Sequence, residues 1–428
     1  MEKVIAGIQQ IGIGIPDVHK ATEWYRKYFG MDIKVFEDAA TAELMLPYTG
    51  GKPHDRTAIL TLNMKGGGGF EIWQYTSRKP QPAEFDIKMG DLGINCGKIK
   101  SINVPQTFEE MTAAGLDVIT PLKKTPADEF TFFVKDLYGN IWQIVESTSF
   151  YKKKTPSSTG GVVGAVIGSS DIDKSLKLYR DVLGYDVVVF DETGSFSDFG
   201  GLPNGDDQYR RVLLRHSEVR KGGFSKMFGP TEIELIEVKV REGRKIYEDR
   251  YWGDLGFIHL CFDIQGMDYL QEDLEEEGFP FTVDSANSFD MGEAAGRFTY
   301  VEDPDGTLIE FVETHRVPIL KKLGWYIDMT KRDPKKNLPD WMIGALKFNK
   351  LNDPESSSRL SGAAKTGWLF LAAWVVFQIV LFNSGLENSS VQVSSWATWS
   401  FLTLASFFIP FLLVKGGGSI KRLVQNKA

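Results

Sequence analysis

The sequence predicts an α+β fold in which one strand–helix–strand–strand–strand unit occurs four times and is followed by two transmembrane helices. Three observations predict this fold. Motifs in the first half of the chain recur in the second half. Each half opens with an apolar strand followed by an amphipathic helix. The end of the chain carries two apolar runs, of which the second is long enough to cross a membrane as a helix and the first needs its flanking residues to do so.

The composition is that of a globular protein without a disulfide framework. The chain has 428 residues, enough for two or three domains, and its only cysteines are Cys96 and Cys261. We therefore expect a reducing compartment. The formal net charge of -8 argues against a nucleic-acid partner. Residues 1–5 show no charged-then-apolar leader, so no cleavable signal peptide is predicted.

The first predicted domain spans residues 1–150. Residues 11–15 form a strand, and Pro16 and Asp17 then open a helix that ends at Gly30. The apolar positions of this helix recur at helical spacing, at Val18, Ala21, Tyr25 and Tyr28. Three strands complete the first unit, and a second unit of the same order fills the rest of the domain.

The second predicted domain, residues 161–315, repeats the first. A constant separation relates Asp17, Lys20, Tyr25, Arg26 and Gly30 to Asp171, Lys174, Tyr179, Arg180 and Gly184. Late in each half, residues 134–140 (VKDLYGN) correspond to residues 301–307 (VEDPDGT). Residues 152–161 have the composition of a linker. The insert at 195–229 is expected to be either a lid over a cleft or a solvated loop.

Two strands within residues 256–312 carry the first candidate site residues. His259 lies in the apolar strand 257–262, and Glu310 lies in the apolar strand that follows residue 306. An ionised Glu310 in such a strand is costly unless a cation compensates its charge. A neutral imidazole is a common metal ligand, so His259 is a candidate co-ligand. The alternative is that His259 is a core histidine and that Glu310 pairs with an Arg or Lys.

These features resemble the vicinal oxygen chelate superfamily, which includes glyoxalase I and the extradiol dioxygenases. The resemblance covers residues 4–313 and is carried by the strand–helix openings and by Asp-Pro-Asp-Gly at 303–306 before the Glu-bearing strand. It implies tandem glyoxalase-like domains built of four βαβββ modules. It also implies that each module offers one metal ligand on its first strand and one on its last, and that two modules curl around each metal.

The resemblance maps candidate ligands onto each module. Module one offers Gln10 and Glu71, and module four offers His259 and Glu310. Modules two and three are poorer, because they place Asn95 or Cys96, Gln143, Gly164 and Glu234 at these positions.

Two pairings of the modules are open, and we favour the pairing across the halves. It gives a metal site of Gln10, Glu71, His259 and Glu310, which is the ligand set that the resemblance to glyoxalase I implies. Pairing within the halves gives Glu234, His259 and Glu310 instead. Without a metal, Gln10 would be a solvent-facing strand residue and Glu71 a carboxylate at the rim of the cleft.

This ligand set predicts a metal-dependent lyase or isomerase. Oxygen-rich ligation with one imidazole suits Zn, Ni, Co or Mn, and Fe less well. The reaction is proton abstraction next to a metal-chelated carbonyl of a small oxo or hydroxycarbonyl substrate. By the resemblance, Glu310 is the first choice of general base and Glu71 the second. The alternatives are a non-catalytic binding or assembly subunit of a membrane complex and a dioxygenase.

The chain after residue 315 predicts membrane attachment. Residues 316–350 form a basic, Trp-bearing membrane-proximal segment, 351–365 a linker, 366–415 a transmembrane hairpin and 416–428 a basic tail. Positive charges flank both outer ends of the hairpin, so both termini are expected in the cytoplasm. We thus expect a multi-pass protein of the cell inner membrane, with its soluble domains facing the cytoplasm and with lipid and a membrane complex as partners.

Overall fold

All four predicted modules are present in the computed structural model, which describes residues 2–286, 289–290, 295–320 and 325–351. The first module consists of β1 (Val4–Gly14), α1 (Val18–Phe29), β2 (Ile33–Thr41), β3 (Asp55–Leu62) and β4 (Gly69–Tyr75), with a 3₁₀ turn at Leu46–Tyr48. The second consists of β5 (Gly93–Ser101), α2 (Val104–Ala113), β6 (Asp117–Val118), β7 (Lys123–Lys124), β8 (Phe130–Lys135) and β9 (Ile141–Glu146).

The second half follows the same plan. The third module consists of β10 (Thr159–Gly168), α3 (Ile172–Leu176) with a π-helical continuation at Lys177–Val182, β11 (Val187–Gly194), β12 (Tyr209–Arg215), α4 (Ser225–Phe228) and β13 (Glu232–Val238). The fourth consists of β14 (Gly256–Gln265), α5 (Met267–Glu276), β15 (Val283–Asp284), β16 (Phe289–Asp290), β17 (Ala295–Glu302) and β18 (Leu308–Leu320). The insert expected at 195–229 as a lid or solvated loop instead includes a whole strand and a short helix.

Helix α1 begins and ends where the sequence predicts. The Asp17 side chain accepts hydrogen bonds from the backbone N–H groups of His19 and Lys20, which satisfies two donors of the first turn. Gly30 ends the helix at φ 64°, a left-handed conformation that glycine adopts without steric cost. Asp171 caps the corresponding helix α3 in the same way, by accepting from the backbone N–H of Lys174.

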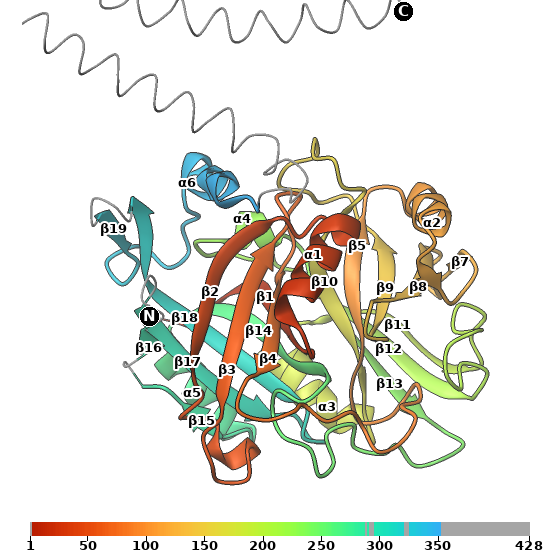
Figure 1. Cartoon of the computed structure of the whole chain (residues 1–428). Helices are drawn as coiled ribbons and strands as arrows, with labels where there is room; N and C mark the ends of the chain where they lie inside the picture. Colours follow the sequence, from red (N-terminus) through yellow and green to blue (C-terminus); the bar gives the residue numbers. More distant parts are fainter. Residues whose placement is uncertain (1, 287–288, 291–294, 321–324, 352–428) are drawn as a thin grey trace, which may run out of the picture. The chain divides into compact units, whose positions relative to one another are not determined.

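The strands form two mixed sheets, and each sheet combines modules from both halves of the chain. The first has the order β15-β17-β18-β14-β1-β4-β3-β2, and the second has the order β11-β12-β13-β10-β5-β9-β8-β6. Antiparallel pairing of β1 with β14 joins modules one and four, and pairing of β10 with β5 joins modules two and three. The favoured pairing across the halves is therefore the one that the structure has (Figure 1).

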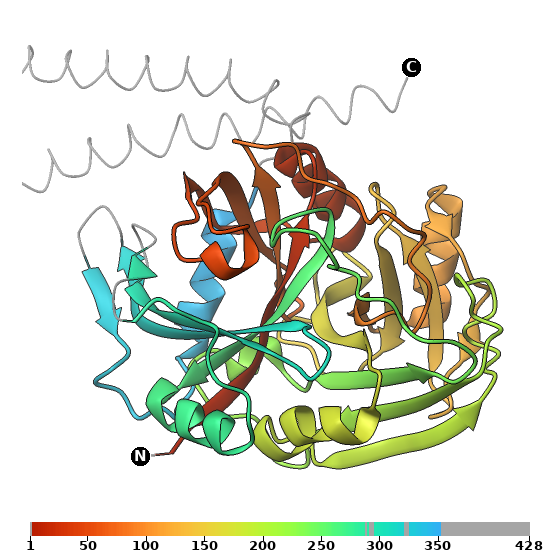
Figure 2. The same cartoon turned by 90° about the horizontal axis from the view of Figure 1, so that it is seen from below.

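One hydrophobic core holds the two sheets together. Helix α1 lies between β4 of the first sheet and β10 of the second (Figure 1). Its Tyr25 and Phe29 pack edge-on against Phe70 and Trp142, which come from β4 and β9. Figure 2 shows the two sheets as separate curled layers on either side of this core. One face of each sheet packs against this core. A functional site can therefore lie only on the opposite face of each sheet.

The repeated motifs bind one another. Tyr25 of α1 donates a 2.5 Å hydrogen bond to the buried carboxylate of Asp136, in the VKDLYGN motif of the same half. Tyr179 donates a 3.0 Å hydrogen bond to Asp303 of the VEDPDGT motif. Burial raises the pKa of Asp303 to about 6, although hydrogen bonds from Thr307, Asp305 and Tyr179 oppose this rise. These two contacts tie together the modules of each half, which lie in different sheets.

The segment 316–350 packs on the folded body. Beyond β18 it forms β19 (Trp325–Asp328), α6 (Asp340–Ala345) and a 3₁₀ turn (Leu346–Asn349). Its Met329, Leu338 and Ile343 are buried in a cluster with Met64 of the first module and Met227 of the third. The compact unit consequently extends to Leu351.

The predicted hairpin at 366–415 and the tail at 416–428 lie outside the described residues, as does the linker at 351–365 except for Leu351. Among the residues that the structure does describe, no helix has the length and apolar character needed to cross a membrane.

We predict that Tyr25→Phe and Tyr179→Phe each lower the free energy of unfolding by about 1.5–3 kcal/mol, because each removes a hydrogen bond to a buried carboxylate. Tyr28→Phe is the control, since it removes the same hydroxyl from a half-buried position on α1. It should change stability by less than about 0.5 kcal/mol. Urea denaturation of the three variants measures the difference; equal effects would show that the two contacts do not hold together the modules within each half.

Candidate metal centre

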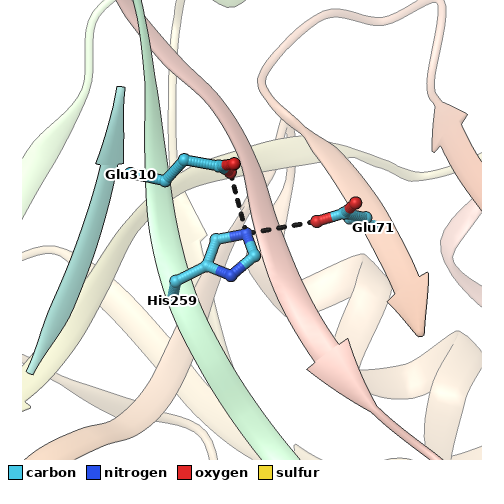
Figure 3. Close-up of side chains that lie close together, drawn as sticks. All are labelled: Glu71, His259 and Glu310. Carbon is cyan, nitrogen blue, oxygen red and sulfur yellow. Dashed lines mark ion pairs between the residues drawn. The ribbon is translucent and has the colours of Figure 1, made fainter. Parts of the chain in front are cut away.

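Four polar side chains from the two ends of the repeat meet on the face of the first sheet that is turned away from the helices. Gln10 comes from β1, Glu71 from β4, His259 from β14 and Glu310 from β18. Figure 3 shows Glu71 and Glu310 directed at the ring of His259, Glu310 from the strand next to β14 and Glu71 from the far side of β1. The structure thus brings together every residue of the favoured ligand set.

The strand register explains this convergence. Gly12 of β1 is paired with His259 on one side and with Glu71 on the other. Gln10 is paired with Cys261, which is in turn paired with Glu310. Residues two apart in a strand share a face, so these pairings place all four functional side chains on one side of the sheet.

Gly12 makes room for the imidazole. A Cβ atom at this position would lie 2.4 Å from Cε1 of His259 and 2.7 Å from each ring nitrogen. Any side chain here would push the ring out of the site, because such distances are far below van der Waals contact. The glycine is therefore part of the site although it contributes no functional group.

The distances define a compact donor set. Nε2 of His259 lies 3.1 Å from Oε2 of Glu310 and 3.2 Å from Oε2 of Glu71. The Gln10 amide nitrogen donates to both carboxylates, at 3.3 Å to Glu71 and 3.4 Å to Glu310. The candidate ligand atoms of Glu71, His259 and Glu310 all lie within 4.8 Å of one another.

Burial and charge compete at His259. Burial disfavours the imidazolium, but the carboxylates of Glu310 and Glu71 outweigh it and raise the pKa of His259 to about 9. For Glu310, burial favours the neutral acid, yet His259 and hydrogen bonds from Cys261 and Tyr300 lower its pKa overall. Without a metal the imidazolium is thus the cation that compensates the two carboxylates.

The site is nearly closed. His259 is fully buried, Gln10 is 4% and Glu310 7% exposed, and the Glu71 side chain retains 14% exposure. Trp252 lies nearly parallel to the His259 ring at 6.3 Å between ring centroids, and Tyr300 meets its edge at 5.5 Å. The hydroxyl of Tyr300 lies 3.5 Å from Nδ1 of His259, so it orients the ring with Nε2 towards the carboxylates.

The donor set fits a divalent cation. Oε1 of Gln10 and Nε2 of His259 are buried and have no hydrogen-bond partner with suitable geometry. A half-turn of the Gln10 amide exchanges its nitrogen for this free oxygen, which can then face a cation. With a protonated imidazole the site carries one net negative charge, whereas a divalent ion and a neutral imidazole make it neutral. A buried site favours the neutral arrangement.

The corresponding positions of the second sheet lack these ligands. Val166 of β10 pairs with Cys96 and with Glu234, just as Gly12 pairs with His259 and Glu71. Cys96 thus takes the place of His259, which settles the choice between Asn95 and Cys96. By the same register, Gly164 replaces Gln10, and Gln143 replaces Glu310.

Basic side chains neutralise the acidic groups that remain in the second sheet. Nζ of the buried Lys98 lies 2.6 Å from Glu234 and 2.8 Å from Glu232. The buried guanidinium of Arg211 bridges Glu234 and Asp198 at 2.7 and 2.8 Å. Burial alone would raise the pKa of Glu234, but Arg211 and Lys98 lower it to about 2. The structure therefore keeps Glu234 away from His259 and does not assemble the alternative set of Glu234, His259 and Glu310.

Several of these residues escaped the sequence analysis. Lys98 and Arg211 carried no motif. Tyr300 approaches His259 through the sheet pairing, and Trp252 approaches it from the loop before β14. Gly12 did leave a signal, because glycines alternate with isoleucines at 11–15 and glycine within a strand often marks a close approach.

Several solved structures are similar to this chain. A candidate dioxygenase from Bacillus subtilis is 14% identical, with a TM-score of 0.50, and the match covers 82% of this chain and 98% of that chain. Glyoxalase I from Zea mays is 12% identical, with a TM-score of 0.45 and coverage of 73% and 92%. The Mn(II)-bound glyoxalase from Novosphingobium aromaticivorans is 13% identical, with a TM-score of 0.23 and coverage of 79% and 88%. No curated protein matches the chain.

The fold and the site together define a protein of paired βαβββ modules with a His-and-carboxylate cluster on the curled face of one sheet. The family description "Glyoxalase/Bleomycin resistance protein/Dioxygenase superfamily" matches residues 7–144 and 161–311. The chain belongs to this superfamily. The identity to the Bacillus subtilis structure is low, so this similarity supports the fold alone.

We predict that Gly12→Ala abolishes high-affinity metal binding and lowers the free energy of unfolding by about 1–3 kcal/mol, because the added methyl group displaces His259. Gly194→Ala is the matched control, since Gly194 also lies in a strand and its Cβ would meet nothing within 4 Å. Metal titration and denaturation of both variants provide the measurement. Metal affinity retained in Gly12→Ala would contradict the placement of His259.

We predict that metal binding at pH 7.5 releases about one proton, because His259 must lose its proton before Nε2 can act as a ligand. Since its folded pKa is about 9, the affinity should rise about tenfold per pH unit up to that value and level off above it. Calorimetry in two buffers of different ionisation enthalpy measures the proton count. In His259→Gln the residual metal binding should lose this slope; a slope unchanged in that variant would refute the assignment.

Proposed function

We propose that this protein is a metal-dependent lyase or isomerase of the glyoxalase type, acting on a small oxo or hydroxycarbonyl compound. The observation that carries the proposal is the convergence of Gln10, Glu71, His259 and Glu310 within one buried cluster. This set offers one imidazole nitrogen and three side-chain oxygens, which suit Zn, Ni, Co or Mn. The bound ion would act as a Lewis acid that polarises a substrate carbonyl.

In this proposal, Glu310 is the general base and removes a proton from the carbon next to the carbonyl. Its Oε2 is held on the same side of the sheet as Oε2 of Glu71, because both approach Nε2 of His259. As the base, Glu310 would be bound only loosely to the ion, so that burial in its apolar surround, which favours the protonated acid, would strengthen it. Glu71 is the second candidate, and its partly exposed side chain marks the side from which a substrate would enter.

We also propose that residues 366–415 anchor the protein in the cell inner membrane as a helical hairpin, with residues 1–350 in the cytoplasm. The apolar runs at 367–382 and 395–414 and their basic flanks support this arrangement. A second component of a membrane complex is the corresponding proposed partner.

A non-catalytic role is the second candidate function, and the closure of the site favours it. Trp252 and Tyr300 surround His259, and only Glu71 retains appreciable exposure among the four proposed ligands. A metal sealed in this way could stabilise a binding or assembly subunit without turning over a substrate. Deuterium exchange into substrates distinguishes the two functions, because only the enzyme catalyses it.

We predict that the purified protein contains one divalent ion per chain and catalyses exchange of α-protons in D₂O. The probes are hydroxyacetone, dihydroxyacetone and the thiohemiacetal of methylglyoxal, followed by NMR. Glu310→Gln should reduce exchange by roughly a thousandfold or more while metal content, measured by mass spectrometry, stays near one. His259→Gln should lose the metal.

Glu37→Gln is the control, because Glu37 lies on β2 at the surface, where it pairs with Lys34. It should change neither the metal content nor the exchange rate. Full metal content without exchange of any probe would favour the non-catalytic function, and bound iron with oxygen uptake would indicate a dioxygenase.

A further inference from the structure

An exposed patch of aromatic and basic side chains lies where the described chain ends. Trp341 of α6 is 58% exposed and Phe348 of the following turn is 79% exposed, both unusually high for large apolar residues. Lys347 lies over the Phe348 ring, with 5.0 Å between Nζ and the ring centroid. We call this the exit patch, and its members are Lys152, Lys226, Trp341, Lys347, Phe348 and Lys350.

The linker between the two halves contributes to the exit patch. The hydroxyl of Tyr151 donates a 2.9 Å hydrogen bond to the backbone oxygen of Asp340, which fixes the linker against α6. Nζ of Lys152 lies 3.4 Å from the position that a Cβ atom of Gly344 would occupy. The exposed Lys153 and Lys154 follow directly in the chain.

The exit patch carries more positive charge than its own carboxylates can neutralise. Lys226 pairs with Asp340 at 3.0 Å, and Lys350 pairs with Asp32 at 2.8 Å. Within the part of the chain that the structure describes, Lys152 and Lys347 have no carboxylate in ion-pair distance. By contrast, Lys331, Lys335 and Lys336 of the same segment are paired with Asp328, Glu2 and Asp333.

The chain leaves the compact unit beside the exit patch. The backbone N–H of Leu351 donates a 2.8 Å hydrogen bond to the oxygen of Asp32, and Lys350 bridges to Ile33 at the start of β2. The first apolar run begins at residue 367. The 15 intervening residues span at most about 50 Å when fully extended, so a bilayer entered by that run must lie within this distance of Leu351.

We propose that the exit patch rests on the surface of an anionic phospholipid bilayer. Aromatic residues such as Trp341 and Phe348 partition into the headgroup region, and the surrounding lysines are attracted by anionic lipids. This docking sets which side of the folded unit faces the bilayer. It rests on the proposed membrane attachment but not on any chemistry at the metal centre, so failure of the metal-centre proposal leaves it standing.

The test is a lysine-labelling footprint of the full chain reconstituted in vesicles. Acetylation rates of individual lysines are compared between vesicles of pure phosphatidylcholine and vesicles containing about 30% phosphatidylglycerol. We expect Lys152 and Lys347 to be labelled at least fivefold more slowly on the anionic vesicles. Lys123 and Lys177 are internal controls, because both are exposed and belong to modules two and three, whose β7 and α3 lie away from α6 (Figure 1). Equal rates at Lys152 and Lys347 on the two kinds of vesicle would overturn the proposal.

A second measurement uses residues 1–351, which form a compact unit with their own hydrophobic cores. This fragment should sediment with the phosphatidylglycerol vesicles in low salt and be released by salt. Each lysine near an anionic surface contributes about fivefold in affinity, so Lys152→Glu with Lys347→Glu should weaken binding at least tenfold. Trp341→Ala with Phe348→Ala should also weaken it.

The matched controls are Lys123→Glu with Lys177→Glu for charge and Val219→Ala with Val240→Ala for exposed apolar area. They should retain binding within twofold. Equal loss in the controls, or binding that is independent of phosphatidylglycerol, would mean that the exit patch is not the lipid-binding surface.

Discussion

The antiparallel pairing of β1 with β14 is the constraint on which the rest of this structure depends. These strands are far apart in the sequence, yet their register places Gly12 opposite His259 and Gln10 opposite Cys261. A slip by one residue would turn each of these side chains to the other face of the sheet. The packed core on the helix side, with Ile11 and Leu260 fully buried, makes such a slip costly. Packing energy on one face therefore fixes the geometry of the candidate metal centre on the other.

The second sheet shows what the same scaffold does without an added cation. Both sheets carry carboxylates at matching positions, the partly exposed Glu71 in one and the buried Glu234 in the other. In the second sheet Lys98 and Arg211 supply the compensating charges from within the chain. In the first sheet no lysine or arginine among the described residues reaches Glu71 or Glu310, and His259 alone is left to balance them. Duplication followed by divergence thus gives one sheet neutralised by its own side chains and one suited to a metal.

The sequence predicts much of the fold because its signals are local or repeated. Asp17 and Gly30 mark the ends of a helix by capping chemistry, and the repeated motifs reveal the modules. That His259 and Glu71 lie close together could be expected only from the family resemblance. That they bind a metal stays a prediction. Lys98 and Arg211 could not be assigned, because their partners are set by long-range register. The burial of Met329 and Leu338 was also hidden, since no periodic pattern marks isolated residues that fill a gap.

The same pairing across the halves also positions residues 247–254, which cover the candidate metal centre. This cover limits the routes by which a substrate could reach the centre. Residues 247–254 precede β14, and Asp254 holds them in place by accepting from Arg78 at 2.5 Å and from the backbone of Gln81 at 2.7 Å.

Tyr75 of β4 donates to the backbone oxygen of Trp252, the residue that faces His259. The contacts that hold this cover thus join the first and fourth modules, as the ligands do. Asp254 is buried and joins residues 247–254 to the segment that follows β4. Moving residues 247–254 away from His259 would therefore break several hydrogen bonds at once. The side chain of Glu71 is 14% exposed without any such loss, so under the proposed function a small ligand would enter beside it.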